Sequence, residues 1–439
     1  MAKKSTPPRV PASPRESAMQ DGQSGLLPKL RFPEFRKNGT WNIKSLEEVC
    51  DRIVEKVGGA GYITVSITAG RGFVSQFEKF GRDISGAQYK NYIHVKRGDF
   101  AYNKGNSNLY PQGCVYQLTE FDEAAASNAF ICFRLKPPNA PGFYVGLFEK
   151  NTHGKQLIRF LTSGARSDGL LNIKPEEFFS VKFPIPRESA EQHKIASCLS
   201  TLDELIGAQG RKVAALRTHK KGLMQQLFPR EGETQPRLRF PEFQDAPEWE
   251  SQTLGHLFET TTGGTPRRAE KAYWNGDIPW VTTSLVDFRV ITEAEEFITK
   301  QGLDNSSAKL FPKGTVLMAL YGQGKTRGQV AVLGIQATTN QACAAILPRT
   351  GIDPYFLFLN LSGRYEEIRS MSNSGGQENL SQTLVREIPF TFPNDPIEQY
   401  KITSLLTSLD ELITAEMQKL EALKTIKRGL MQQLFPSPE

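Results

Sequence analysis

The sequence lacks several features that would place a protein in a class at once. No apolar run approaches the roughly eighteen residues needed to span a membrane, and the N-terminus has no apolar signal core. These absences predict a cytoplasmic protein. The five cysteines form no CxxC pair, and the five histidines are equally scattered. This scatter argues against a disulfide framework and against a metal site.

The motifs of the common enzyme classes are missing too. There is no Gly-rich dinucleotide fingerprint after a strand, no NPPY-like adenine-methylation tetrapeptide, no GxSxG elbow and no HExxH pair. Residues 319–326 (ALYGQGKT) fit a relaxed phosphate-binding loop, with Ala at the first Gly position. The first half of the chain has no counterpart, and the nearest apolar run, residues 355–359, ends in Asn360 rather than in a carboxylate for magnesium. We therefore expect a non-catalytic chain without cofactor or metal, and an ATP-using enzyme built on this loop is an alternative.

Charge gives a weaker indication. The 439-residue chain has a formal net charge of +7 and a pI near 9.0. A basic balance suits a polyanionic partner, because Lys and Arg neutralise phosphates and release counterions. Many basic proteins bind no nucleic acid, so the charge alone decides little.

An internal duplication is the strongest signal in the sequence. Five short features recur in the same order, three at an offset of 207 residues and two at an offset of 208. They are residues 191–195 (EQHKI) and 398–402 (EQYKI), 202–205 and 409–412 (LDEL), 222–229 and 429–436 (GLMQQLFP), 31–35 and 239–243 (RFPEF), and Trp41 and Trp249. The period is far too long for a solenoid. Because residues 45–165 and 253–370 resemble each other only faintly, the pattern predicts a shared scaffold that presents two different surfaces.

Each EQ motif opens a run of apolar residues spaced alternately by four and three, which is typical of a coiled-coil helix. The predicted seam comprises Leu199, Leu202, Ile206, Val213, Leu216 and Leu223 in the first run, and Leu406, Leu409, Ile413, Leu420, Leu423 and Leu430 in the second. No proline interrupts either run, so each helix can extend over roughly 35–40 residues, or about 55 Å. We expect the two helices to pair antiparallel and to act as a ruler. The alternative is that each helix packs against its own domain.

The predicted fold class is α+β, with two mixed α/β domains joined by two long helices that form an antiparallel coiled coil, in a pseudo-twofold internal repeat. Strands are expected at residues 62–67, 115–118, 130–135, 316–320 and 329–333, and amphipathic helices at 143–161 and 354–371. The predicted boundaries are a disordered N-terminal tail at 1–26, a first domain at 27–184, a first helix at 185–229, a linker at 230–236, a second domain at 237–391 and a second helix at 392–439.

Taken together, these motifs resemble the specificity (S) subunits of type I restriction-modification systems. The repeated EQ, LDELI and GLMQQLFP segments carry the resemblance, with residues 263–266 (GGTP) and 277–282 (DIPWVT) in the second domain. The resemblance implies two target-recognition domains, each of which reads one half of an asymmetric bipartite site on double-stranded DNA. It also implies two methyltransferase (M) subunits that use S-adenosylmethionine, and restriction/translocase (R) subunits that use ATP and magnesium. The first domain matches the GGTP and DIPWVT pattern poorly.

Polar, Gly-containing loops after predicted strands supply the candidate DNA contacts, because Lys, Arg, Asn and Gln can read base edges. The candidates are Arg71, Lys104, Asn106, Asn108 and Arg166 in the first domain, and Arg267, Arg268, Tyr321, Gln323, Lys325 and Arg327 in the second. A solvated loop without DNA contact has the same composition. A second alternative is therefore an assembly protein whose coiled coil dimerises and whose domains bind protein instead of DNA.

Overall fold

The computed structural model describes residues 26–105, 110–161, 171–322, 325–371 and 379–436. The chain divides into two compact units, one formed by residues 1–209 with 419–439 and the other by residues 210–418. Each unit contains one α/β domain together with parts of the two long helices. The units therefore differ from the predicted domains, because the division falls inside both helices rather than at their ends.

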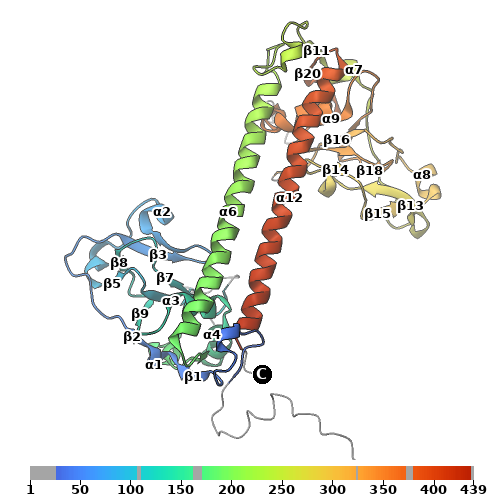
Figure 1. Ribbon diagram of the computed structural model, residues 1–439. Helices are drawn as coiled ribbons and strands as arrows, with labels where there is room; N and C mark the ends of the chain where they lie inside the picture. Colours follow the sequence, from blue (N-terminus) through green and yellow to red (C-terminus); the bar gives the residue numbers. More distant parts are fainter. Residues whose placement is uncertain (1–25, 106–109, 162–170, 323–324, 372–378, 437–439) are drawn as a thin grey trace, which may run out of the picture. The chain divides into compact units, whose positions relative to one another are not determined.

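The two long helices are α6 (Ser189–Leu227) and α12 (Pro396–Leu434), each of 39 residues. Within each unit, the parts of α6 and α12 that belong to it run side by side in opposite directions (Figure 1). In the second unit Lys212 pairs with Glu416 and Lys220 with Asp410, so that rising numbers on α6 meet falling numbers on α12. In the first unit, Lys427 of α12 pairs with Asp203 of α6. The antiparallel pairing expected from the heptad pattern is confirmed within each unit.

The predicted seam residues lie on the inner faces of these helices. Four of them, Leu199, Val213, Leu406 and Ile413, are at most 8% exposed. The other eight are partly buried, and two of these, Leu223 and Leu430, pack against the cores of the second and the first unit. Apolar residues at alternate spacings of four and three thus face inward, and a few charged side chains, including Glu416 and Lys427, are buried with them.

The described residues of the first domain form two four-stranded sheets and a two-stranded one. One sheet has the order β2-β9-β6-β7, with β2 at Cys50–Arg52, β9 at Ile131–Leu135, β6 at Phe100–Asn103 and β7 at Cys114–Gln117. The other has the order β4-β3-β8-β5, with β4 at Gly72–Ser75, β3 at Thr64–Thr68, β8 at Glu123–Ala126 and β5 at Ile93–Lys96. Strand β1 (Asn42–Ser45) pairs antiparallel with β10 (Lys182–Ile185), which leads into α6.

The second domain repeats this plan despite its different sequence. Its larger sheet has the order β12-β19-β16-β17-β14, at Thr260–Thr262, Cys343–Ile346, Val316–Ala319, Val330–Leu333 and Val290–Ile291. Its smaller sheet has the order β15-β13-β18, at Glu296–Ile298, Trp274–Val281 and Thr338–Thr339. Strands β11 (Glu250–Thr253) and β20 (Pro389–Phe392) pair as β1 and β10 do. A parallel pair, β3 with β8 and β13 with β18, occurs in each domain, so β3 corresponds to the DIPWVT strand.

Two helices predicted as continuous are each broken in two. The first becomes α3 (Pro141–Glu149) and α4 (Thr152–Leu157), separated at Asn151, whose φ of 57° is left-handed. Asn tolerates this conformation better than other residues with side chains, and it ends a helix for that reason. The second becomes α9 (Pro354–Gly363) and α10 (Tyr365–Met371), which separate at Arg364. The spacing of apolar residues in the sequence continues across both helix breaks, so this spacing could not predict them.

The repeated GLMQQLFP segments complete the domain cores. In the first unit, Leu434 at the end of α12 and the following Phe435 are buried with Trp41 and Phe143, and the Phe435 and Phe143 ring centroids are 5.3 Å apart. In the second unit, Leu227 at the end of α6 and the following Phe228 occupy the same place, and the Phe228 and Phe356 ring centroids are 5.2 Å apart. The end of each repeat therefore packs into the domain that begins the other repeat. This exchange explains why the compact units cut across the repeats in the sequence.

Candidate nucleic-acid interface

In the first domain, two of the candidate contacts lie where strands end next to each other. Arg71 is exposed in the turn between β3 and β4, and it forms an ion pair with Glu78 at 2.6 Å. Lys104 follows β6 directly, and its carbonyl oxygen accepts a hydrogen bond from the Leu171 amide. The Asn103 side chain lies 3.5 Å from the Ile67 carbonyl oxygen, so the two strand ends meet. Asn106, Asn108 and Arg166 lie outside the described residues.

In the second domain, the loop between β16 and β17 carries the corresponding candidates. Tyr321 is 45% exposed, Lys325 is exposed, and Arg327 is partly buried. The hydroxyl group of Tyr365 donates a hydrogen bond of 2.5 Å to the Lys325 carbonyl oxygen, which ties the loop to α10. Gln323 lies outside the described residues. Strands β16 and β17 correspond to β6 and β7, so both polar loops connect the same pair of strands in their sheets.

The two arginines after the GGTP segment differ in their surroundings. Arg267 is exposed. Arg268 forms an ion pair with Glu296, and its guanidinium lies over the Trp274 and Trp280 rings, 3.9 and 4.7 Å from their centroids. Stacking on two indoles and pairing with a carboxylate hold this side chain in one orientation. Arg268 can therefore shape the surface beside Arg267 even without contacting DNA itself.

The structure adds polar residues that sequence reasoning missed. The turn between β18 and β19 contains Asn340 and the exposed Gln341, and it lies between the two candidate loops of the second domain. Gln341 accepts a hydrogen bond from the Thr265 hydroxyl at 2.6 Å, and the Ala342 carbonyl accepts one from the Leu320 amide. The corresponding turn between β8 and β9 carries the exposed Asn128. Asn and Gln amides can pair with adenine. No sequence motif marks these residues; only their position in the turn after the strands β8 and β18, which correspond to each other, indicates them.

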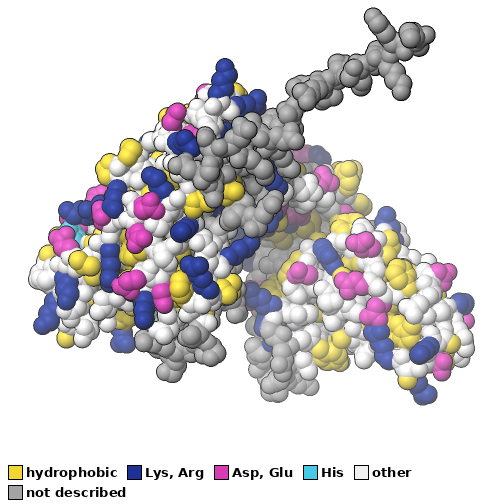
Figure 2. All heavy atoms as spheres, turned by 90° about the horizontal axis from the view of Figure 1, so that it is seen from below, with side chains coloured by type: hydrophobic (Ala, Val, Ile, Leu, Met, Phe, Trp, Pro, Cys, Tyr) yellow, Lys and Arg dark blue, Asp and Glu magenta, His cyan; other side chains and the backbone are white. Residues whose placement is uncertain are grey.

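Figure 2 shows that Lys and Arg side chains do not gather in one patch on the face drawn, where Asp and Glu lie among them. On this face the basic side chains therefore form no single continuous surface.

The segment that resembles a phosphate-binding loop has the wrong structural setting. In such a loop, a strand leads through the glycines into the N-terminus of a helix. Here β16 leads through turn residues 325–328 into β17, and the two strands pair antiparallel with Met318 opposite Val330. The described part of this loop offers no helix N-terminus to a phosphate. The geometry argues against the ATP-using alternative.

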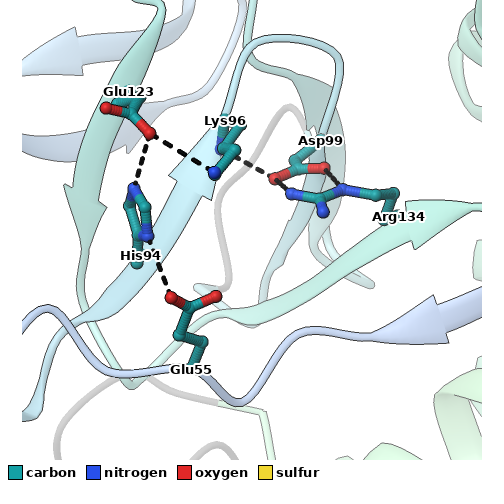
Figure 3. Close-up of polar contacts among 6 residues, drawn as sticks. All are labelled: Glu55, His94, Lys96, Asp99, Glu123 and Arg134. Atoms are coloured by element: carbon teal, nitrogen blue, oxygen red, sulfur yellow. Dashed lines mark hydrogen bonds and ion pairs between the residues drawn. The ribbon is translucent and has the colours of Figure 1, made fainter.

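A network of charged side chains connects the two larger sheets of the first domain (Figure 3). His94 on β5 lies between the carboxylates of Glu123, at 3.2 Å, and Glu55, at 3.4 Å. Arg134 on β9 forms an ion pair with the buried Asp99 at 2.6 Å, and Asp99 also accepts a hydrogen bond from the Lys96 amide. The charges in this network are balanced by partners within the domain, which favours a structural role.

Each unit also contains a buried ion cluster that explains two of the repeated motifs. Glu191 forms an ion pair with Arg31 at 2.7 Å and accepts a hydrogen bond from the Trp41 indole at 3.2 Å. Glu398 does the same with Arg239, at 2.7 Å, and with the Trp249 indole, at 3.2 Å. Both glutamates are 1% exposed. The RFPEF segment, the tryptophan and the EQ motif therefore recur because they meet at one point.

The glutamine of each EQ motif has a separate role. Gln192 accepts a hydrogen bond from the Ala140 amide at the start of α3, and Gln399 accepts one from the Asp353 amide at the start of α9. The side chain thus satisfies an amide next to the N-terminus of a domain helix. The start of each long helix is tied to its domain in this way.

The buried cysteine thiols of the first domain include those of Cys50 and Cys114. Burial raises the pKa of Cys114 to about 11 and that of Cys50 to about 12, so both thiols are protonated near neutral pH and are poor nucleophiles. Among the described residues, no group of three or more His, Cys, Asp or Glu side chains is placed to hold a metal ion.

His153 in the first domain gives a pH-dependent prediction. It lines a cavity of about 290 Å³, and neither ring nitrogen has a hydrogen-bond partner among the described residues. Burial lowers the pKa of His153 from 6.5 to about 4. The unfolded chain therefore binds a proton more readily between these values, so stability is lost as the pH falls from about 6.5 towards 4.

Replacement of this histidine should remove that dependence. Between pH 7 and pH 5, we expect the wild-type free energy of unfolding to fall by about 2 kcal/mol more than that of the His153→Met variant. Urea unfolding of both proteins at the two pH values measures this difference. Equal pH dependence in the two proteins would mean that His153 is not held neutral by the fold.

A family model and two relatives of known class all match this chain as a specificity protein of type I restriction systems. A family model described as the type I restriction modification DNA specificity domain matches residues 38–216 and again residues 247–425. The chain is 28% identical over 193 residues to the MjaIX specificity subunit of Methanocaldococcus jannaschii, a match that covers 43% of this chain and 44% of that subunit. It is 24% identical over 328 residues to the EcoR124I/EcoR124II specificity subunit of Escherichia coli, covering 68% of this chain and 75% of that one. The match thus spans less than half the length of the first relative and three quarters of the second.

Solved structures share the fold. The S subunit of the type I restriction-modification system from M. genitalium aligns with a TM-score of 0.59 at 18% identity, over 94% of this chain and 100% of that one. In none of the ranges that the structure describes is a helix long and apolar enough to cross a membrane. The resemblance found in the sequence is confirmed by the family match. The chain belongs to the family of type I restriction modification DNA specificity domains and contains two copies of that domain.

Proposed function

We propose that this chain is the DNA-specificity subunit of a type I restriction-modification complex and that it reads an asymmetric, bipartite site. The observation that carries the proposal is the pair of domains with the same sheet plan and different loops, each of which lies in a unit with antiparallel segments of α6 and α12. Two copies with equal loops would favour a palindromic target. Because these loops differ, we expect two different half-sites.

In this proposal the chain positions other subunits and performs no chemistry itself. Two methyltransferase subunits would bring S-adenosylmethionine, and restriction/translocase subunits would bring ATP and magnesium. Base contacts would come from the loops between β6 and β7 and between β16 and β17, together with the polar turns at Asn128 and Gln341. Phosphate contacts from Lys and Arg would set the register on the duplex, while amide side chains in the major groove would select bases.

Replacement of Lys325 tests the loop assignment. We expect Lys325→Ala to weaken binding of the chain, assembled with its methyltransferase subunits, to its cognate DNA by about 1–3 kcal/mol, because one direct contact is lost. Titration of labelled cognate DNA at several salt concentrations gives both the affinity and its salt dependence. Lys424→Ala, an exposed position on α12, is the matched control. Unchanged affinity together with an unchanged salt dependence would remove Lys325 from the interface.

An assembly protein without DNA binding is the remaining alternative. To separate the two, the chain is mixed with its methyltransferase subunits and with a pool of random DNA fragments, and the bound fragments are recovered by gel shift and sequenced. A DNA reader enriches one bipartite sequence. Recovery of unselected fragments, with the protein complex intact, would favour the assembly role.

A further inference from the structure

The turn between β18 and β19 is closed by one of its own side chains. The side-chain oxygen of Asn340 accepts a hydrogen bond of 3.1 Å from the Ala342 amide. The first domain has the same arrangement between β8 and β9, where the Ser127 hydroxyl oxygen accepts a hydrogen bond of 3.3 Å from the Ala129 amide. Because a backbone amide can only donate, the oxygen of Asn340 faces the turn and its NH2 group is left for a ligand.

The next residue, Gln341, is exposed, and its side-chain oxygen is also engaged within the protein. It accepts a hydrogen bond of 2.6 Å from the hydroxyl group of Thr265, which belongs to the GGTP segment at residues 263–266. The NH2 group of Gln341 is therefore the part of this side chain that a ligand can use. Both amides of the turn thus hold their oxygens inside the domain and offer hydrogen-bond donors.

The GGTP segment is fixed against this turn. The Gly264 amide donates a hydrogen bond of 2.8 Å to the Thr339 carbonyl oxygen, and the Gly264 carbonyl oxygen accepts one of 3.0 Å from the Trp280 indole. A Cβ atom on Gly263 would collide with the Thr339 carbonyl oxygen, so only glycine allows so close an approach. Thr265 follows directly, and its hydroxyl group is therefore held at the turn.

The bases differ in the donors and acceptors that they show in the major groove. Guanine shows two neighbouring acceptors, N7 and O6, whereas thymine shows one acceptor beside a methyl group and cytosine shows a donor. Adenine shows one acceptor and one donor, and a glutamine pairs with both only if its oxygen and its NH2 group reach the same base edge. In Gln341 the oxygen is directed at Thr265 instead. Two neighbouring NH2 donors therefore match guanine best.

We propose that Asn340 and Gln341 form a donor pair that selects guanine in the half-site contacted by the second domain, and that Thr265 sets this choice by holding the Gln341 oxygen. The inference rests on the proposed function, because it assigns the base at one position of that half-site. Asn340 and Gln341 contact the base in this proposal, and Thr265 is a positioning residue that acts through Gln341.

Removal of both donors tests the contact. Asn340→Ser with Gln341→Ala removes the two NH2 groups, and the serine keeps an oxygen that can close the turn, as Ser127 does in the first domain. Once the recognition sequence has been mapped from its methylated adenines, each of its guanines is replaced in turn by 7-deazaguanine, which lacks the N7 acceptor. Wild type and variant, each assembled with methyltransferase subunits, are titrated with these duplexes.

At one of these guanines, we expect the replacement to weaken binding of wild type about tenfold and binding of the double variant by less than about twofold. Gln301→Ala, which removes an exposed glutamine from α8 (Lys300–Asp304), is the matched control and should keep the loss of about tenfold. Each result is a ratio of two affinities measured on one preparation, so a fraction of unfolded protein does not change it.

Replacement of Thr265 tests the origin of the choice. Thr265→Val removes the hydroxyl group and frees the Gln341 oxygen, so that the amide can pair with adenine through both of its groups. We expect the preference for guanine over adenine at this position to fall at least about fivefold in Thr265→Val. Thr265→Ser keeps the hydroxyl group and should keep the preference.

Two results would overturn the inference while the proposed function stands. In the first, wild type selects two half-sites, but every 7-deazaguanine replacement has the same effect on wild type and on the double variant. In the second, Thr265→Val keeps the full preference for guanine. Selection of no DNA sequence by the wild-type complex would instead contradict the proposed function, and the inference with it.

Discussion

Replacement of Glu398 by alanine should lower the free energy of unfolding by about 3–5 kcal/mol, because the buried Arg239 would lose the carboxylate that pairs with it. Arg239 and Glu398 are 9% and 1% exposed, so water cannot take over the role of the lost carboxylate. The Trp249 indole, 3.2 Å from Glu398, would lose its hydrogen-bond acceptor as well. Urea unfolding followed by tryptophan fluorescence measures the loss.

Two further variants identify the cause. Glu421→Ala removes an exposed carboxylate from the same helix, and it should change the stability by less than about 1 kcal/mol. The double variant Arg239→Met with Glu398→Leu removes both charges and should recover most of the stability lost in Glu398→Ala. If the single and double variants were equally unstable, the loss would come from packing rather than from the unpaired arginine.

Paired insertions of seven residues, one after Gln209 and one after Gln418, should shift the methylated site to a spacer longer by about three base pairs and abolish activity on the original spacer. These positions are the boundaries at which the compact units divide, so the contacts within each unit are preserved. Seven residues make two turns and keep the apolar seam in phase. Each helix lengthens by about 10 Å. Sequencing of methylated library DNA, with the variant assembled on its methyltransferase subunits, measures the spacer.

The control for this experiment is the same insertion in the linker. After Gly232, which has a φ of 79° and open space around its Cβ position, seven additional residues should leave the spacer unchanged. Full activity of the helix-insertion variant on the original spacer would show that the length of the helices does not determine the spacer length.

Much of the scaffold could be predicted from the sequence, because its signals are local or repeated. The heptad spacing around Leu199 and Leu406 predicted the two helices, and the shared offset predicted that they are equivalent. What the sequence could not show is where the ends of the helices pack. Phe435 belongs to the first unit and Phe228 to the second, an exchange between repeats that depends on contacts far apart in the chain.

The domains were harder to predict, for reasons that particular residues illustrate. The break at Asn151 depends on a single left-handed residue inside an apolar pattern. The equivalence of β3 and β13 is visible in the strand order but hardly in the sequence, because different side chains can fill a buried strand. Gln341 was missed as a candidate contact since only the sheet brings its turn between the two predicted loops. All the candidate DNA contacts remain predictions, and four of them, Asn106, Asn108, Arg166 and Gln323, lie outside the described residues.

The most direct test of the central claim is a map of the adenines that are methylated when the chain and its methyltransferase subunits are expressed together in a host that lacks other adenine methylation. We expect every methylated site to contain two different half-sites, separated by a spacer of constant length and variable sequence. A palindromic site, a continuous site without a spacer, or methylation without sequence preference would contradict the account.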